Sequence, residues 1–136
     1  MSQNFSHIAL QLNQDKALIF TAMSKHLFYY RMFISKFVLE LDKIPVNPFM
    51  SFDYFLTDAV NRDLIRNANN NLLKRSDELW VFGTISDGVL AEIKFAQRLH
   101  KPISYFRITA DLRIVAVEDL NKIDFEIDVQ QYQTQL

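Results

Sequence analysis

The sequence predicts a single α/β domain built on a parallel sheet, with helices covering both faces of that sheet. Short, continuous apolar runs alternate with longer segments whose apolar residues recur at helical spacing. Continuous apolar runs are typical of strands buried on both faces, and their alternation with helices is typical of parallel sheets. The 136 residues suit one domain with a sizeable core. We expect that domain to span residues 1–136, with a core at about 17–117 and a polar tail that frays from Val129.

About five strands are expected. The apolar run 17–22 is interpreted as the first strand, and the run 79–83 is the clearest strand in the chain. Pro45 and Pro48 leave room for at most a short strand at 46–47, because proline is confined to the edges and ends of strands. The two remaining candidates are residues 103–106 and 113–117.

Three helices are expected between the strands, over 27–41, 55–74 and 87–99. The second carries an apolar stripe at i, i+4 spacing, which predicts a buried face made of Leu56, Val60, Leu64, Ala68 and Leu72. The third places apolar residues on one face, namely Val89, Ile93, Ala96 and Leu99.

Two other clusters have both a structural and a functional interpretation. Residues 49–55 hold an aromatic cluster of Phe49, Phe52, Tyr54 and Phe55, which suits core packing, a subunit interface, or a platform on which a base stacks. Residues 67–71 hold four asparagines inside the second helix, although asparagine is a poor helix former. They are either a tolerated polar patch or residues that line a pocket and contact a base or ribose.

Composition excludes several classes of function. The chain has no cysteine, so disulfides, thiolate nucleophiles and cysteine-based metal sites are ruled out, and a reducing, cytoplasmic location fits this. The three histidines are scattered, so we expect no metal and no cofactor. A net charge of −1 lacks the basic footprint of a nucleic-acid binder. The apolar runs are too short to span a membrane, and the N-terminus lacks the pattern of a signal peptide.

The chain has only two glycines, Gly83 and Gly88, and both fall between the clearest strand and the helix after it. Glycine suits a sharp turn or the close approach of a ligand to the backbone. Because the loop leads into a helix, its free N–H groups predict an anion site for a phosphate or carboxylate. Ser86 or Asp87 can equally serve as the helix N-cap.

Glu92 is the strongest candidate for a catalytic residue. It lies one turn inside this helix, between Ala91 and Ile93, in an otherwise apolar segment. Most helical glutamates are solvated surface residues. The first turns of this helix face the crevice at the carboxyl ends of the strands, where a carboxylate can attack the anomeric carbon of a sugar.

The segment Ser86-Asp87-Gly88-Val89-Leu90-Ala91-Glu92 resembles the Ser-x-Gly-x-x-x-Glu signature of the nucleoside 2-deoxyribosyltransferase-like superfamily. The flanks, Asp77 with the strand after it and His100-Lys101-Pro102-Ile103, are also similar to that family. The resemblance covers about residues 17–106 and is specific over 77–106. It implies a flavodoxin-like, Rossmann-like three-layer fold with about five parallel strands, and a homodimer or larger homo-oligomer.

The resemblance also implies an activity, the cleavage or transfer of an N-glycosidic bond in a nucleoside or nucleotide. Glu92 would attack the anomeric carbon and form a covalent glycosyl-enzyme, which water or a second base would resolve. Ser86 and the Gly88 backbone would bind the sugar or its 5′-phosphate, with Gly83 and Asp87 in the same loop as further substrate-binding candidates.

Two departures from the family matter. The first loop has no glycine, although its Ser24, Lys25 and His26 remain candidates for binding phosphate. The position at which the family places an acid is Asn69, which cannot transfer a proton as a carboxylic acid does. Asp63 lies two turns earlier and is a candidate substitute, or a partner of Arg62 in a surface ion pair.

Three functions therefore remain open. The first is a deoxyribosyltransferase or nucleotide N-glycosidase. The second is a module of the same fold that binds a nucleotide without cleaving it, which the two departures favour. The third is a structural assembly protein, for which the aromatic cluster is the only support.

Overall fold

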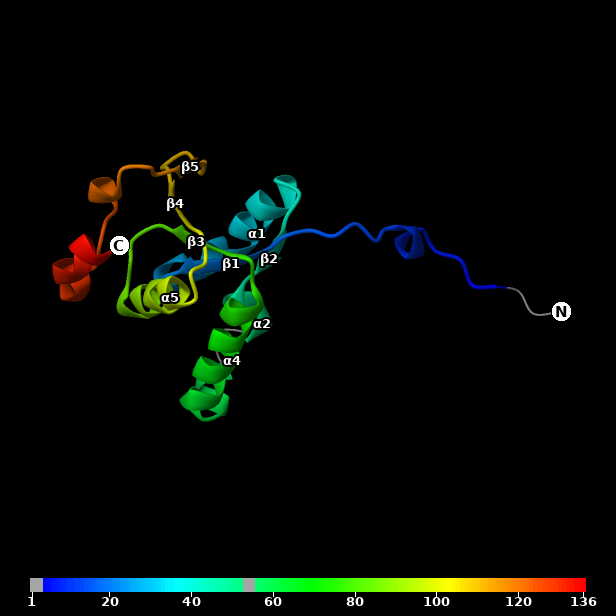
Figure 1. Ribbon diagram of the computed structural model, residues 1–136, viewed down its shortest axis with the longest axis horizontal. Coiled ribbons are helices and arrows are strands. Elements are labelled where there is room, and N and C mark those ends of the chain that lie inside the picture. The colour runs from blue at the N-terminus through cyan, green and yellow to red at the C-terminus, as the bar shows by residue number, and fades with distance from the viewer. Residues whose placement is uncertain (1–3, 53–55) are drawn as a thin grey trace.

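The computed structural model describes residues 4–52 and 56–136 and contains a five-stranded sheet in the order β2-β1-β3-β4-β5 (Figure 1). The strands are β1 (Leu18–Met23), β2 (Ile44–Val46), β3 (Glu78–Phe82), β4 (Ile103–Ile108) and β5 (Ile114–Ala116). The first four run parallel. The expected α/β fold with a largely parallel sheet is confirmed.

β5 departs from the expectation of an all-parallel sheet, because it pairs antiparallel with β4. The connection between the two strands is a tight turn in which the Thr109 N–H donates to the Arg113 carbonyl at 2.8 Å. A parallel crossover needs a dozen or more residues. The connection is far shorter than that, so only a hairpin can form.

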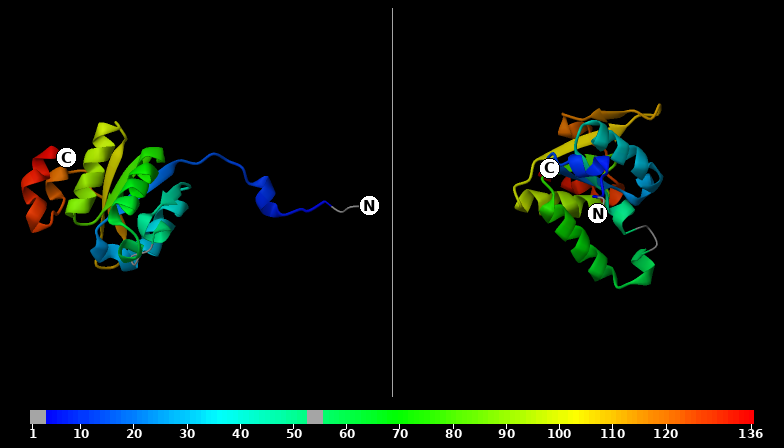
Figure 2. Two further views of the ribbon diagram at one scale, coloured as in Figure 1. Left: turned by 90° about the horizontal axis from the view of Figure 1, so that it is seen from below. Right: turned by 90° about the vertical axis from the view of Figure 1, so that its right-hand side faces the viewer.

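Helices cover both faces of the sheet (Figure 2). α1 (Arg31–Glu40) packs on one face, where Ile34 and Val38 are buried beside Trp80 and Phe82. α4 (Arg62–Arg75) and α5 (Asp87–Arg98) pack on the other face. The remaining helical segments are short, and comprise α2 (Pro48–Ser51), α3 (Leu56–Ala59) and 3₁₀ helices at Ile8–Gln11, Lys25–Tyr30, Leu120–Lys122 and Ile127–Gln135.

The expected helix over 27–41 begins as the 3₁₀ helix Lys25–Tyr30 and becomes α-helical only at Arg31. The expected helix over 55–74 is likewise divided, and its first residue, Phe55, lies outside the described residues. α3 ends at Ala59, and α4 begins anew after Asn61, whose side chain caps it by accepting from the Asp63 N–H at 2.8 Å.

The apolar stripe predicted on this segment meets the core only at its C-terminal end, where the half-buried Leu72 packs against the core. Leu56, Val60 and Leu64 are 40%, 45% and 65% exposed, while Leu73, outside the stripe, is fully buried. Residues four apart share a helix face. The face of α4 that meets the core therefore runs through Asn69 and Leu73, and the stripe faces outward along most of its length.

The C-terminal segment is docked rather than frayed. Phe125 forms a parallel bridge with Ile85, and the Ile85 N–H donates to the Asp124 carbonyl at 2.9 Å. Val129, with 5% exposure, belongs to the core. The alternation of apolar and acidic residues over 123–126 is the signal for an extended, half-buried segment, because period-2 alternation is typical of such segments. The segment ends at Ile127, which is 88% exposed and begins a 3₁₀ helix.

The N-terminal segment differs from the rest of the chain. Residues 4–16 extend away from the sheet and helices (Figures 1 and 2), and they are exposed except for Lys16, which is half-buried. In the parts of the chain that the structure describes, there is no helix both long and apolar enough to cross a bilayer.

Candidate functional site

The candidate site lies where two loops meet at the carboxyl ends of β1 and β3. The register pairs Met23 with Phe82, the last residues of the two strands, so the loops that start at Ser24 and Gly83 lie next to each other. The sheet order also reverses at β1, because β2 lies on one side of β1 and β3 lies on the other. Sheets of this kind bind ligands in the crevice at this switch point.

Gly83 allows these two loops to approach closely. Its φ of +77° lies in the region that side chains rarely adopt, and a Cβ atom there would lie 2.6 Å from Leu27 Cδ1. Gly83 is therefore required by the turn itself. Gly88 differs, because nothing lies within 4 Å of the place where its Cβ would be.

The N-terminus of α5 is satisfied by its own residues. Ser86 is the N-cap, and its Oγ accepts from the Val89 N–H at 3.3 Å. Asp87 Oδ1 accepts from the Gly88 N–H at 2.7 Å. The expectation of a set of free N–H groups is thus wrong for two of them, and the Asp87 carboxylate already supplies negative charge where an anion would bind.

Glu92 and Asn69 meet between α5 and α4. Asn69 Nδ2 donates a hydrogen bond to Glu92 Oε2 at 2.7 Å. Asn69 lies four residues before the fully buried Leu73, and Glu92 lies next to the fully buried Ile93. Both side chains are therefore carried on the inward edges of their helices, and each is partly buried.

The surroundings of Glu92 change its titration. Loss of hydration on burial raises the pKa of the Glu92 carboxyl from 4.5 to about 7, although the Asn69 hydrogen bond lowers the pKa by stabilising the ionised form. A carboxyl group with this pKa exchanges a proton near neutral pH. Glutamates tuned in this way are common among general acids, general bases and nucleophiles.

Asp63 is placed differently from Asn69. It lies in the first turn of α4, and its Oδ1 accepts a hydrogen bond from Arg66 at 3.0 Å, so its ion-pair partner is Arg66 rather than Arg62. Asp63 and Asn69 are six residues apart, which places them about 9 Å apart along the helix axis and on different faces. The structure brings Asn69 to Glu92 and leaves Asp63 exposed at the surface.

The first loop places its three candidates in different environments. Ser24 is buried with 4% exposure, whereas Lys25 and His26 are exposed. His26 Nε2 lies 3.5 Å from Glu126 Oε1, and the Glu126 N–H donates to the Ile85 carbonyl at 2.9 Å. The C-terminal segment therefore brings a second carboxylate to the rim of the site, a residue that the sequence analysis did not identify.

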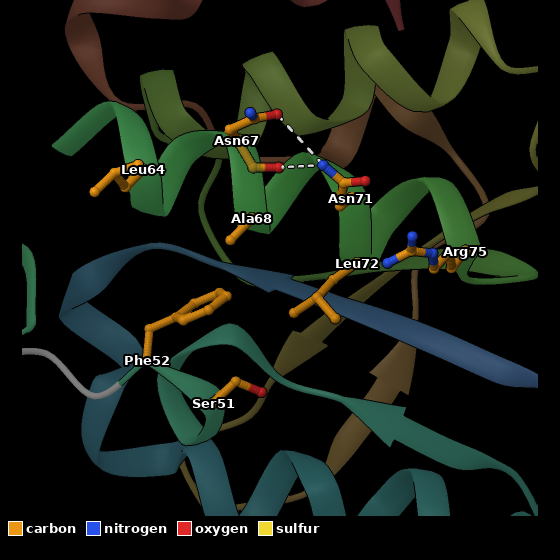
Figure 3. A pocket seen from close by; sticks show the side chains of 8 residues that line it. All are labelled: Ser51, Phe52, Leu64, Asn67, Ala68, Asn71, Leu72 and Arg75. Atoms are coloured by element: carbon orange, nitrogen blue, oxygen red, sulfur yellow. Dashed lines mark hydrogen bonds between the residues drawn. The ribbon is translucent and has the colours of Figure 1, made fainter. Parts of the chain in front are cut away.

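Of the asparagine cluster, Asn69 contacts Glu92, whereas Asn67 and Asn71 lie elsewhere. Asn67 and Asn71 line a groove with a volume of about 460 Å³ (Figure 3). Helix periodicity places Asn69 on a different side of α4. Phe52 also lines this groove, whereas Phe49 packs edge-on against Phe28 with ring centroids 5.5 Å apart. Tyr54 and Phe55 lie outside the described residues. Within residues 4–52 and 56–136, no group of three potential metal ligands converges.

Comparison with known proteins supports the interpretation of the fold. Residues 20–106, more than half of the chain, match the family model described as Domain of unknown function (DUF7768). No curated protein matches the chain. The chain is similar to the solved structure of a 2-deoxyribosyltransferase from Leishmania mexicana, with a TM-score of 0.54 and 15% identity over 84% of this chain and 85% of that one.

A second similar structure is the 2-deoxyribosyltransferase from the psychrotolerant bacterium Bacillus psychrosaccharolyticus, described as a biocatalyst for the synthesis of nucleosides. Its TM-score is 0.57, with 15% identity over 86% of this chain and 90% of that one. At this identity the similarity is one of fold. The resemblance to 2-deoxyribosyltransferases expected from the sequence is confirmed at that level.

Proposed function

This chain belongs to the family described as Domain of unknown function (DUF7768) and has the fold of the 2-deoxyribosyltransferases, and from this premise we propose that it cleaves or transfers the N-glycosidic bond of a nucleoside. The observation that carries the proposal is the partly buried Glu92 on α5, the helix that follows the Gly83 loop, whose carboxyl group accepts a 2.7 Å hydrogen bond from Asn69. Fold alone does not assign an activity, so the proposal depends on the chemistry of this carboxyl group.

In the proposed reaction Glu92 is the nucleophile. Asn69 fixes Oε2 and favours the ionised carboxylate, so Oε1 is free to attack the anomeric carbon. The bond from that carbon to the base nitrogen breaks as the ester bond to Glu92 forms, and the base leaves with the bonding electron pair and takes up a proton. Water or a second base then attacks the same carbon, releases the carboxylate and loses a proton.

The N-terminus of α5 favours a nucleoside over a 5′-phosphate. Asp87 and Ser86 already occupy two of its N–H groups, and the Asp87 carboxylate would repel a phosphate. A neutral sugar hydroxyl can instead bind to Ser86 or Asp87 without this repulsion. Lys25 and His26 are exposed on the facing loop, and they are where a phosphate would bind if the substrate carries one.

A binding module that does not cleave its ligand is the second candidate, and the Asn69 side chain favours it. An amide holds a carboxylate in place but cannot supply a proton to the departing base. If the activity is absent, the residues around Glu92 would bind the nucleoside and stabilise the folded protein.

The test is incubation of the purified protein with a panel of nucleosides and nucleoside 5′-monophosphates, with and without an acceptor base, followed by chromatography of the released base. We expect release from at least one nucleoside, and none from the Glu92→Gln variant. Release that persists in Glu92→Gln would refute the mechanism. A nucleoside that raises the melting temperature without being cleaved would support the binding module instead.

A further inference from the structure

The N-terminal arm, residues 4–16, carries an unusual density of exposed apolar side chains. Phe5, Ile8, Leu10 and Leu12 are 80%, 65%, 69% and 74% exposed. The arm projects away from the domain and brings none of these side chains into the core (Figures 1 and 2). A concentration of exposed apolar residues of this kind is typical of a surface that binds another molecule.

The spacing of these residues suits an amphipathic helix. Phe5, Ile8, Ala9 and Leu12 lie at i, i+3, i+4 and i+7, which is the pattern of anchors on a helix that binds in a groove. One 3₁₀ turn, Ile8–Gln11, is already formed there, and His7 Nδ1 caps it by accepting from the Ala9 N–H at 3.0 Å. Binding would extend this turn and bury the four side chains together.

The root of the arm is held so that the arm leaves its own domain. Lys16 Nζ lies 2.6 Å from Asp42 Oδ1, and the Ile44 N–H donates to the Ala17 carbonyl at 2.9 Å. The Leu18 N–H donates to Asp77 Oδ2 at 2.7 Å. These contacts hold residues 16–18 on both sides and set the direction in which the arm leaves the sheet.

The same chain has an empty, partly apolar groove between α2 and α4, here called the α2–α4 groove, which could accept apolar side chains. Eight residues line this space of about 460 Å³, namely Ser51, Phe52, Leu64, Asn67, Ala68, Asn71, Leu72 and Arg75. Phe52 points into the groove from the end of α2, and Ala68 and Leu72 point into it from α4 (Figure 3). Three residues of the predicted apolar stripe, Leu64, Ala68 and Leu72, therefore form one wall of this groove, and Leu72 also packs against the core.

We propose that the arm of one copy of this chain docks as a helix in the α2–α4 groove of a second copy, and that the exchange is reciprocal. Lengths agree, because residues 5–15 span about 15 Å as a helix and residues 64–75 of α4 span about 16 Å. The Arg75 end of the groove lies next to the arm's root, because the chain that follows Arg75 reaches Asp77, the partner of Leu18. A twofold axis near this point would place Asp15 beside the second copy's Arg75 and run Leu12, Ile8 and Phe5 along the groove towards Leu64.

The first test is the oligomeric state of the full chain, measured by sedimentation over a concentration series. We expect a dimer in which Ile8→Asp with Leu12→Asp weakens association by roughly a hundredfold, since each buried side chain is worth about a tenfold change. The control, Ser6→Asp with Gln11→Asp, adds the same charge away from the anchors and should leave the dimer intact. A monomeric wild type, or a dimer that tolerates the anchor substitutions, overturns the proposal.

A cross-linking test distinguishes an arm that binds a second copy from an arm that binds the groove of its own chain. The chain has no native cysteine, so only the introduced cysteines can form disulfides. A mixture of Phe5→Cys and Leu64→Cys chains should form a disulfide-linked heterodimer, whereas Ser6→Cys in place of Phe5→Cys should not. Both substitutions of the first pair are at exposed positions, so the fold should be retained. If the mixture forms no heterodimer, the proposed exchange of arms is wrong. The same holds if the double variant, Phe5→Cys with Leu64→Cys in one chain, forms its disulfide within a monomer. Neither test depends on the proposed activity.

Discussion

Asn69 donates a 2.7 Å hydrogen bond from Nδ2 to Oε2 of Glu92, across the contact between α4 and α5. The bond opposes the loss of hydration that raises the pKa of Glu92 to about 7. The bond keeps part of the Glu92 population ionised at neutral pH. It also fixes Oε2, which leaves Oε1 of Glu92 free to act as the nucleophile. An amide in this position takes the place of the acid that the resemblance led us to expect.

Removal of this hydrogen bond should change the pH dependence of base release. The rate should rise with pH as Glu92 ionises near pH 7 and should then reach a plateau. In Asn69→Ala the pKa of Glu92 should rise further, so the rising part of the profile moves to higher pH. A charged hydrogen bond is worth about one pKa unit, so the rate at low pH should fall about tenfold with a much smaller change on the plateau.

Asn70→Ala is the matched control, because Asn70 is an exposed neighbour on the same helix. It should leave the whole profile in place. A profile that falls uniformly at all pH values in Asn69→Ala would show that Asn69 positions substrate or structure rather than the charge on Glu92.

The same carboxyl group should make the stability of the fold depend on pH. Because the pKa is raised from 4.5 to about 7 on folding, Glu92 favours folding when protonated, and this contribution is lost as pH rises through that interval. The wild type should therefore lose up to about 3 kcal/mol relative to Glu92→Gln between the two pKa values. Urea unfolding of both proteins across this range measures the difference, and parallel stability curves would contradict the raised pKa.

The two glycines should respond differently to alanine. Gly83→Ala places a side chain at positive φ, and Leu27 must also move, so we expect a loss of about 1–3 kcal/mol in the free energy of unfolding. Gly88→Ala meets open space in the first turn of α5 and should be neutral or stabilise by up to about 1 kcal/mol. Chemical denaturation of both variants provides the comparison, and equal losses would show that the strain at Gly83 is not real.

Adding Leu27→Ala to Gly83→Ala separates the two costs at this position. The second substitution removes the atom that a Cβ would meet, but it leaves the positive φ unchanged. We expect the φ penalty to dominate, because the end of a leucine side chain can rotate away at low cost. The free energy of unfolding lost through Gly83→Ala should therefore be nearly the same in the Leu27→Ala background as in the wild type.

The parts of the fold that are local in sequence could be predicted. β3 is a continuous apolar run because both of its faces are buried, and α5 has its apolar face and its Ser86 cap within one segment. β5 lies where its apolar run predicts, but the run does not encode its direction, because direction depends on the length of the connection from β4. The apolar stripe over residues 56–72 does not form the predicted core face, because most of it is exposed and only Leu72 packs against the core.

The candidate site was predictable as a list of residues but not as an arrangement. Glu92 and Asn69 were each singled out, yet their contact depends on how α4 and α5 pack on the sheet, which no local pattern encodes. The sequence offers Asp63 or Asn69 as the residue that assists Glu92, and only helix periodicity distinguishes the exposed Asp63 from Asn69, which contacts α5. Glu126 is not identifiable from the sequence, because only the pairing of residues 124–126 with Ile85 brings it to the rim of the site.

The most direct test of the central claim is the intact mass of the protein during turnover, after rapid acid quenching with the nucleoside that it cleaves. An electron-withdrawing substituent on the sugar slows both steps, because both have oxocarbenium-like transition states, so it is combined with a readily released base that keeps the first step faster than the second. We predict a wild-type species heavier by one glycosyl group, with the modification on the peptide that contains Glu92, and no such species in Glu92→Gln. Base release without any adduct, or an adduct on another residue, would contradict the assignment of Glu92 as the nucleophile.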